Sequence, residues 1–367
     1  MSTRTQTQTK SNRAQRSNAW ATLVLTDTER DILATAAGST APDPHLAPSA
    51  FRAIAQAAWS ELRSSTRDRF IELRTGTSER PELHVQNLPL VPALPPTPLA
   101  SSWSRTTAGH FSELLMIAFT TELGYPISYA DQRDGALFHD IYPTRANATK
   151  VSSQSHKVGL GFHSEMFFHP TPPAFLLLHC LRPDPAGVAL TSVADLATIE
   201  RSLSSGDRTA LRQPAYALDL ARLHGSYTYK GRPITKDDPR PCLPVISSDD
   251  RAKFRFEPAL TTPMTQVCSD ALLNAEHAAD ATAVHGALRT GSLLIIDNRR
   301  AAHSRSSFPA RFDGSDRWLR RMMVAASPAD PADGVVRSEN LDLFTPWQDA
   351  GASFAHVPYV ANCGGQA

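Results

Sequence analysis

From about residue 126 onward, the chain consists of short apolar runs separated by Gly, Pro and Asn, and this pattern limits the possible fold most strongly. The runs are PISYA, ALFHDIYP, VGLGFHSEM, AFLLLHCL and GVALTSVA, with GSLLIIDN and RWLRRMMVAA further on. Short strands with frequent turn signals are typical of β-sandwiches and barrels. None of these runs leads into a glycine-rich phosphate turn, so we do not expect a doubly wound nucleotide-binding sheet.

Helical patterns precede and interrupt these strands. One helix is predicted to begin near Thr26 or Asp27 and to end at Gly38. Four other segments have helical patterns, namely 47–66, 110–124, 194–204 and 266–289. The segment 82–101 starts as a strand and then breaks into prolines, which end regular structure. We therefore expect a β-sandwich or barrel core with helical additions.

Two regions fall outside this pattern. Residues 1–18 contain no acidic residue and almost no apolar one, and they lack the apolar face of a transit peptide. We predict a disordered tail there, followed by a single domain over residues 19–367. Residues 214–264 are rich in Pro, Asp and Lys, and we predict an irregular, lid-like insertion.

Composition excludes several classes of function. The net charge of +1 predicts no nucleic-acid binding, and the longest apolar run, AFLLLHCL, is too short to span a membrane. The four cysteines are scattered without a C-x-x-C pair, namely Cys180, Cys242, Cys268 and Cys363. Reduced thiols in a cytoplasmic protein are the simplest interpretation.

A candidate metal site joins two distant segments. His163 and Glu165 would leave the same face of a strand, although H-x-E alone is a common pattern. His303 follows the strand SLLIID by a few residues, and we expect it on a turn at the edge of the core. Two histidines and one carboxylate form the facial arrangement that favours Fe(II) and leaves three positions open. Zinc is the rival metal, but the H-E-x-x-H helix common in zinc hydrolases is absent.

Two arginines beyond His303 offer sites for anions. If RWLRRMMV is a strand, Arg317 and Arg321 share one face and Arg320 points the other way. Guanidiniums in a dry interior are costly unless anions pair with them. A dicarboxylate such as 2-oxoglutarate would supply one anion and the carboxylate of a second substrate the other. An arginine ladder on a solvated edge is the alternative.

Two long blocks carry a resemblance to a known family: GFHSEMFFHPTPPAFLLLHCLRPDPAGVALTSVADL and LLIIDNRRAAHSRSSFPARFDGSDRWLRRMM. They resemble the clavaminate synthase-like Fe(II)/2-oxoglutarate oxygenases, which include bacterial hydroxylases of free arginine, asparagine and lysine used in antibiotic biosynthesis. The likeness covers roughly residues 80–330. It implies an α+β fold with a double-stranded β-helix (jelly-roll) core, with Fe(II) as cofactor and with 2-oxoglutarate and O2 as co-substrates.

The resemblance also implies roles for individual residues. The metal ligands fall on His163, Glu165 and His303. Related halogenases replace the carboxylate with a small residue, so the presence of Glu165 favours hydroxylation or another oxidation. The remaining roles cover the two organic ligands: Arg317 and Thr191 for the distal carboxylate of 2-oxoglutarate, Arg321 for the α-carboxylate of an amino acid, and Gln132 and Ser153 for its amino end.

The chain departs from the family pattern near the position that recognises the substrate side chain. In the family's amino-acid hydroxylases this is an acidic residue upstream of the distal histidine, and it matches Glu257 in this chain. The arginine hydroxylases carry another acid two positions earlier, where this chain has Arg255. That cation would repel a guanidinium substrate or pair with Glu257. Arginine is therefore less favoured than a neutral, acidic or larger substrate.

Several functions remain open at this point. The favoured one is hydroxylation of an unactivated C–H bond in a free L-amino acid or a derivative, in specialised metabolite biosynthesis. Desaturation or ring closure would use the same residues, and the substrate could instead be a non-amino-acid or carrier-bound compound. From other classes, a non-catalytic cupin-like metal-binding module and a zinc hydrolase are the alternatives; the hydrolase would leave the arginines unexplained.

Overall fold

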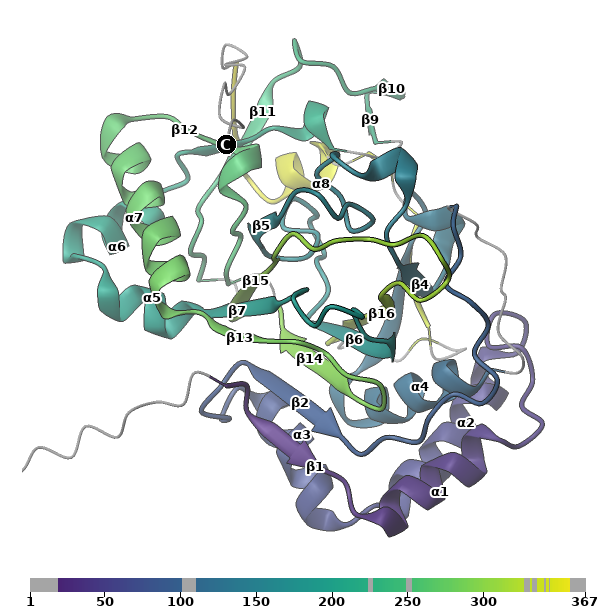
Figure 1. The fold of residues 1–367 in the computed structure, drawn as a ribbon. Coiled ribbons are helices and arrows are strands. Elements are labelled where there is room, and N and C mark those ends of the chain that lie inside the picture. Colours follow the sequence, from purple (N-terminus) through teal and green to yellow (C-terminus); the bar gives the residue numbers. More distant parts are fainter. Residues whose placement is uncertain are drawn as a thin grey trace, which may run out of the picture.

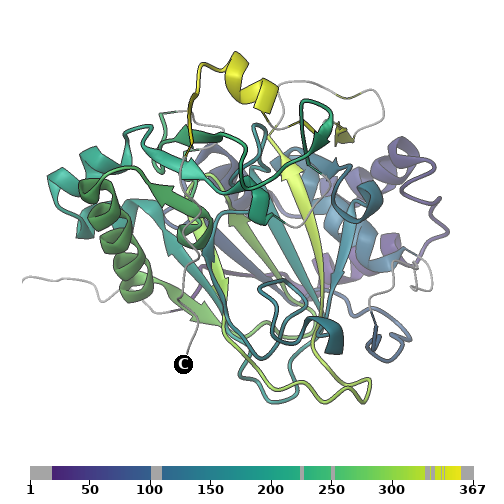
Figure 2. The ribbon, with the colours of Figure 1, turned by 90° about the horizontal axis from the view of Figure 1, so that it is seen from above.

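Two sheets that face each other form the core of the molecule. The computed structural model describes residues 19–100, 110–223, 227–248, 253–326, 331, 335–339, 341–342 and 344–356, so the predicted tail and Cys363 lie outside the described residues. The larger sheet has the strand order β1 (Thr22–Val24), β2 (Glu82–Gln86), β14 (Leu293–Asp297), β6 (Phe175–Arg182), β16 (Trp318–Ala325), β3 (Tyr125–Tyr129) and β17 (Val336–Ser338), and β4 (Phe138–Ile141) also pairs with β16. The smaller sheet has the order β13 (Val284–Gly286), β7 (Thr191–Asp195), β15 (Ala301–Arg305) and β5 (Leu160–His163). The predicted sandwich-like core is confirmed (Figures 1 and 2).

The alternation of side chains along the strands explains the layers. In β6, Leu176 and Leu178 belong to the cluster between the two sheets, whereas Phe175 and Leu177 belong to the cluster on the outer face. Because both faces of this strand are buried, its sequence is apolar almost throughout. Four helices cover the outer face: α1 (Asp27–Ala37), α2 (Pro48–Ser60), α3 (Ser64–Thr75) and α4 (Phe111–Leu123).

The smaller sheet is covered in the same way on its far side. Ala194 of β7 and Ala302 of β15 contribute to a third apolar cluster. The helices that pack there are α5 (Leu196–Ser202), α6 (Ser205–Leu211) and α7 (Gln266–Thr282), and they lie together at one end of the molecule (Figure 1). Helices therefore cover the outer faces of both sheets, and the inner faces of the sheets are turned toward each other.

Several boundaries agree with the sequence and others do not. The side chain of Thr26 caps α1, and Gly38 follows its last residue, as predicted. The sequence did not predict α3, β15 or α8 (Phe344–Asp349). The helix predicted over 266–289 ends at Thr282, because the chain then enters β13.

The insertion predicted as irregular contains regular structure. It includes β8 (Tyr216–Leu218), β11 (Arg240–Leu243) and β12 (Thr261–Pro263), which form a third sheet with β18 (Ser353–Ala355), and a small hairpin of β9 (Thr228–Tyr229) and β10 (Arg232–Pro233). The prediction of irregular structure was therefore wrong for these strands. The third sheet lies beside α8 in Figure 1.

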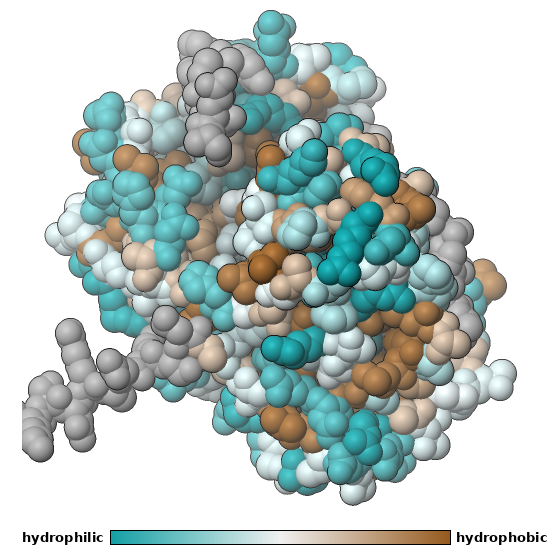
Figure 3. Space-filling view, viewed as in Figure 1, coloured by the Kyte–Doolittle hydropathy of each residue, from teal (hydrophilic) through white to brown (hydrophobic). Residues whose placement is uncertain are grey.

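Across the part of the chain that the structure describes, no helix combines the length and apolar character needed to cross a bilayer. On the face shown in Figure 3, hydrophilic side chains cover much of the surface, with smaller hydrophobic patches between them. Cys180, Cys242 and Cys268 are buried free thiols.

Candidate metal centre

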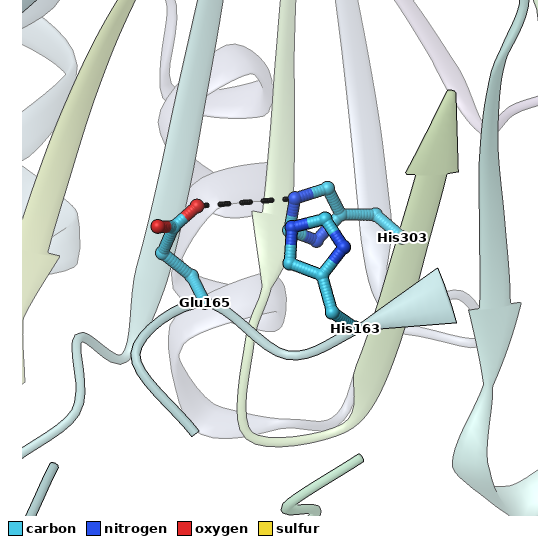
Figure 4. Close-up of side chains that lie close together, drawn as sticks. All are labelled: His163, Glu165 and His303. Atoms are coloured by element: carbon cyan, nitrogen blue, oxygen red, sulfur yellow. Dashed lines mark ion pairs between the residues drawn. The ribbon is translucent and has the colours of Figure 1, made fainter. Parts of the chain in front are cut away.

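Three potential metal ligands meet where β5 ends beside β15. His163, the last residue of β5, lies opposite His303 of β15, and their ring centroids are 4.2 Å apart. The Nε2 atom of His303 lies 3.9 Å from Oε2 of Glu165, which is too long for a hydrogen bond (Figure 4). One ligand atom from each residue lies within 4.8 Å of the others, and no other such group occurs among the described residues.

Two details of the predicted geometry were wrong. His303 lies within strand β15 and not on a turn at the edge of the core. Glu165 lies beyond the end of β5, so strand alternation does not place its side chain. The three residues converge because β15 pairs directly with β5 and because the segment after β5 is held in place by other contacts.

Asn298 holds the backbone of Glu165. The amide N–H of Glu165 donates to Oδ1 of Asn298 at 2.7 Å, and Nδ2 of Asn298 donates to the carbonyl of Glu165 at 3.0 Å. The same Nδ2 also donates to the carbonyl of Pro173 at 2.9 Å. Met166 then adopts a φ of 52°, which turns the chain away directly after the ligand. One buried amide thus joins the exit of β14 to the carboxylate of the metal site.

We expect Asn298→Ala to weaken iron binding and to lower the free energy of unfolding by about 2–4 kcal/mol, because three hydrogen bonds to buried backbone groups are lost. Anaerobic titration with Fe(II) and chemical denaturation would measure the two effects. The matched control is Asn274→Ala on the exposed side of α7, where the side-chain amide donates to Asp207. Equal iron affinity in the two variants would contradict the role of Asn298.

The two histidines are suited to bind a metal as neutral ligands. Nδ1 of His163 lies 2.9 Å from the carbonyl of Gly161, which can only accept, so Nδ1 carries the proton and Nε2 remains for a metal. Burial, followed by the charges of His163 and Arg321, holds the pKa of His303 well below its ordinary value. Nδ1 of His303 is buried and has no hydrogen-bond partner among the described residues.

The three ligands border a pocket between the two sheets. Leucines line much of it, and its polar lining includes Ser153, Thr191, Arg305, Arg317 and Arg321. The predicted positions of Ser153, Thr191, Arg317 and Arg321 are thus brought together around the ligands.

The three arginines at β16 point to two sides, as predicted, although Arg317 lies one residue before the strand. Arg317, Leu319 and Arg321 face the pocket. Arg320 points the other way and forms ion pairs of 2.9 Å with Glu113 and with Asp140. The prediction that Arg317 and Arg321 share a face opposite to Arg320 is confirmed, and the alternative of a solvated arginine ladder is wrong.

Arg317 lacks a counterion. Its side chain is 6% exposed, and in the described part of the chain it forms neither an ion pair nor a hydrogen bond. Its guanidinium carbon lies 5.8 Å from the centre of the ring of Phe308. Burial lowers the pKa of Arg317 to about 10, so the group remains a cation at neutral pH. A buried cation without a partner is costly, and an anion bound beside it would remove this cost.

The guanidinium of Arg321 is held at two corners. Nη1 donates to Oε1 of Glu165 at 2.9 Å, and Nη2 lies 2.7 Å from Nδ1 of His139. Nε is buried without a partner among the described residues. Arg321 therefore touches a metal ligand and still has donors for a further acceptor.

A comparison with protein families decides the class of the protein. The family model described as "Taurine catabolism dioxygenase TauD, TfdA family" matches residues 108–323, which is more than half of the chain. The chain belongs to this oxygenase family. Its enzyme class is therefore that of the Fe(II)/2-oxoglutarate-dependent oxygenases, with Fe(II) as cofactor and 2-oxoglutarate as co-substrate.

Two curated relatives of this oxygenase are named for amino acids. The chain is 31% identical over 307 residues to L-lysine 3-hydroxylase of Catenulispora acidiphila, covering 83% of this chain and 84% of the relative. It is 34% identical over 249 residues to L-asparagine oxygenase of Streptomyces coelicolor, covering 66% of this chain and 72% of the relative.

Solved structures show the same fold. Asparagine oxygenase in complex with Fe(II), 2S,3S-3-hydroxyasparagine and succinate is similar with a TM-score of 0.74 and 26% identity, covering 87% of this chain and all of the other. The non-heme iron oxygenase OrfP with Fe and alpha-ketoglutaric acid gives a TM-score of 0.68 and 27% identity, covering 83% and 94%. The predicted α+β fold with a double-stranded β-helix core is confirmed.

The other three predicted substrate residues of the oxygenase do not border the pocket. The amide of Gln132 donates to Asp131 at 2.9 Å. Glu257 is half-buried; desolvation raises the pKa of its carboxyl, and the charge of His163 opposes this shift. The guanidinium of Arg255 donates to the carbonyls of Phe167 and His169 and stacks over Trp347 at 4.7 Å.

Three residues of the oxygenase site were not predicted from the sequence. Asn298 and His139 act through hydrogen bonds to partners 133 and 182 residues away, and no local pattern reveals such contacts. Arg305 lines the pocket and donates to Ser155 at 2.7 Å. The signal for Arg305 was its spacing, because it lies two residues after His303 and therefore faces the same side of a strand.

Proposed function

We propose that this oxygenase hydroxylates an unactivated C–H bond of a free L-amino acid or a close derivative, with His163, Glu165 and His303 holding the iron. The observation that carries the proposal is the placement of two guanidiniums, the buried Arg317 and the partly buried Arg321, on the side of the larger sheet, across the pocket from the ligands on the smaller sheet. A dicarboxylate and an amino acid supply one carboxylate each for these cations. The names of the curated relatives support the same substrate class.

Each residue of the site has a defined task in this proposal. Arg317, with the hydroxyl of Thr191, binds the distal carboxylate of 2-oxoglutarate. Arg321 binds the α-carboxylate of the amino acid. Ser153 contacts its amino end in the pocket, whereas Gln132 and Glu257, which lie outside the pocket lining, would contact the amino end and the side chain where the substrate extends beyond that lining. Bound iron and 2-oxoglutarate together supply the power to activate O2 and oxidise a C–H bond, as 2-oxoglutarate is converted to succinate and CO2.

The apolar lining of the pocket supports an oxidation that excludes water. Five apolar side chains surround the polar groups, namely Ile141, Leu160, Leu176, Leu178 and Leu319. These side chains limit access of water to the reacting centre and strengthen the contacts of the two guanidiniums with anions. Desaturation or cyclisation would need the same surroundings, and a carrier-bound substrate is the second candidate for the same chemistry.

We also infer that residues 214–264 close over the substrate, and that the product enters a specialised metabolite such as an antibiotic. The short helical turn Pro258–Leu260 directly follows Glu257, and Arg255 connects this insertion to the segment after Glu165. Binding of the substrate side chain by Glu257 would thus be coupled to the position of the insertion.

The proposal is tested by measuring succinate release in the presence of Fe(II), 2-oxoglutarate, O2 and individual L-amino acids. We expect at least one amino acid to stimulate succinate release and to gain one oxygen atom in mass. A loss of two hydrogens instead would indicate desaturation or ring closure. Consumption of 2-oxoglutarate without stimulation by any amino acid would contradict the proposed substrate class.

A further inference from the structure

His139 lies behind Arg321, on the strand next to it. It belongs to β4, and the antiparallel register of β4 and β16 places it directly opposite Arg321. Its side chain is buried, with 1% exposed. It does not border the pocket, so neither iron nor substrate would touch it. Among the described residues, its side chain connects to the site through the guanidinium of Arg321.

The hydrogen bonds of His139 determine where its proton lies. Nε2 lies 3.0 Å from the carbonyl oxygen of Ala136, which can only accept, so Nε2 carries the hydrogen. Nδ1 lies 2.7 Å from Nη2 of Arg321, which can only donate, so Nδ1 presents its lone pair. Burial, followed by the charges of Arg321 and Arg133, holds the pKa of His139 well below its ordinary value. The ring is therefore a neutral acceptor with a fixed direction.

The contact with His139 completes the orientation of Arg321. A planar guanidinium with only one bonded corner can still rotate, whereas two bonded corners define its plane. Glu165 accepts from Nη1 and His139 accepts from Nη2, and the buried Nε has no partner among the described residues. The remaining N–H donors of Arg321 therefore point in a fixed direction before the substrate binds. This lowers the entropic cost of binding a carboxylate.

We propose that His139 is a positioning residue that sets the guanidinium plane of Arg321 for the carboxylate of the substrate. The inference rests on the proposed function, in which Arg321 receives that carboxylate. His139 should therefore affect the affinity for the amino-acid substrate and leave the affinity for 2-oxoglutarate unchanged, because Arg317 binds the other anion.

Two amide substitutions separate the two hydrogen bonds of the ring. In His139→Asn, the side-chain oxygen lies near the place of Nδ1 and still accepts from Arg321, while the bond to Ala136 is lost. In His139→Gln, the amide reaches the place of Nε2 and still donates to Ala136, while Nη2 of Arg321 loses its acceptor. The probe is a mixture of the standard L-amino acids, and the readout is the concentration that gives half-maximal stimulation of succinate release.

We expect His139→Gln to raise the half-saturating concentration by about 10- to 100-fold, because loss of a hydrogen bond to a charged group typically weakens binding by this factor. His139→Asn keeps that hydrogen bond and should raise the half-saturating concentration less than about threefold. The KM for 2-oxoglutarate should stay within about twofold of the wild-type value in both variants. His179→Gln is the matched control, because His179 is a buried histidine bonded to Ser112 outside the pocket. It should change the midpoint of thermal unfolding without changing the half-saturating concentration.

Equal effects of the two His139 variants, or no effect of either, would overturn the inference. Arg321→Gln separates this failure from that of the proposed function. A large effect of Arg321→Gln together with no effect of His139→Gln would overturn only the role of His139. No effect of Arg321→Gln, or no stimulation of the wild-type enzyme by the mixture, would overturn the carboxylate site itself and with it the inference.

Discussion

His303→Ala is expected to reduce 2-oxoglutarate turnover to the background level. His303 supplies one of two neutral imidazoles of the cluster, and no other histidine, cysteine or acid among the described residues completes a similar group. Loss of a hydrogen-bond partner of a metal ligand typically lowers metal affinity or activity by roughly 10- to 100-fold. Loss of the ligand itself should lower them further. The measurements are anaerobic Fe(II) titration and succinate release.

The control for this variant is a second buried histidine near the same pocket. His156 packs edge-on against Phe308 and Phe312 and does not contribute to the metal cluster. We expect His156→Ala to lower stability but to retain stoichiometric iron binding. Full iron binding and turnover by His303→Ala would show that the centre lies elsewhere.

Arg317→Met is expected to raise the KM for 2-oxoglutarate by about 100-fold or more. Removing one partner of a buried charge pair typically costs about 2–5 kcal/mol. Methionine is of similar length and can occupy the buried site without a charge. Because Arg317 has no ion pair or hydrogen bond among the described residues, its removal should not lower the free energy of unfolding of the ligand-free protein.

A raised KM together with an unchanged free energy of unfolding distinguishes a ligand-binding arginine from a structural one. Arg69→Met serves as the control, because Arg69 forms an exposed ion pair with Glu72 on α3. It should change neither the KM nor the stability by a large amount. An unchanged KM for 2-oxoglutarate in Arg317→Met, or a marked loss of stability in the ligand-free protein, would contradict the proposed role.

The strands that are apolar along their length could be predicted from the sequence. AFLLLHCL and SLLIID became β6 and β14, because both of their faces are buried. Alternation in β16 also placed Arg320 and Arg321 on opposite faces, and Arg317, one residue before the strand, borders the same pocket as Arg321. These predictions succeeded because they depend on a period of two residues within one segment.

The predictions that failed depend on contacts between distant segments. Residues 301–305, AAHSR, lack the apolar pattern of a strand, and β15 forms because it pairs with β5 on one side and β7 on the other. In the same way, the third sheet joins short strands of the insertion to β18, which lies about a hundred residues later in the chain. No single segment carries the information for such pairings.

The positions of Glu165 and Arg321 illustrate the same limit within the site. Their residue types could be predicted, but the amide of Asn298 and the ring of His139 that orient them come from the turn after β14 and from β4. Sequence motifs therefore indicate which residues take part in the chemistry. The partners that hold those residues emerge only once the two sheets face each other.

A crystal structure of the protein prepared without oxygen, with Fe(II) and 2-oxoglutarate bound, tests the proposed site most directly. We expect the iron to be bound by His163, Glu165 and His303, and the distal carboxylate of 2-oxoglutarate to contact Arg317. Iron bound away from these three side chains, or a distal carboxylate that does not reach Arg317, would contradict the proposed site.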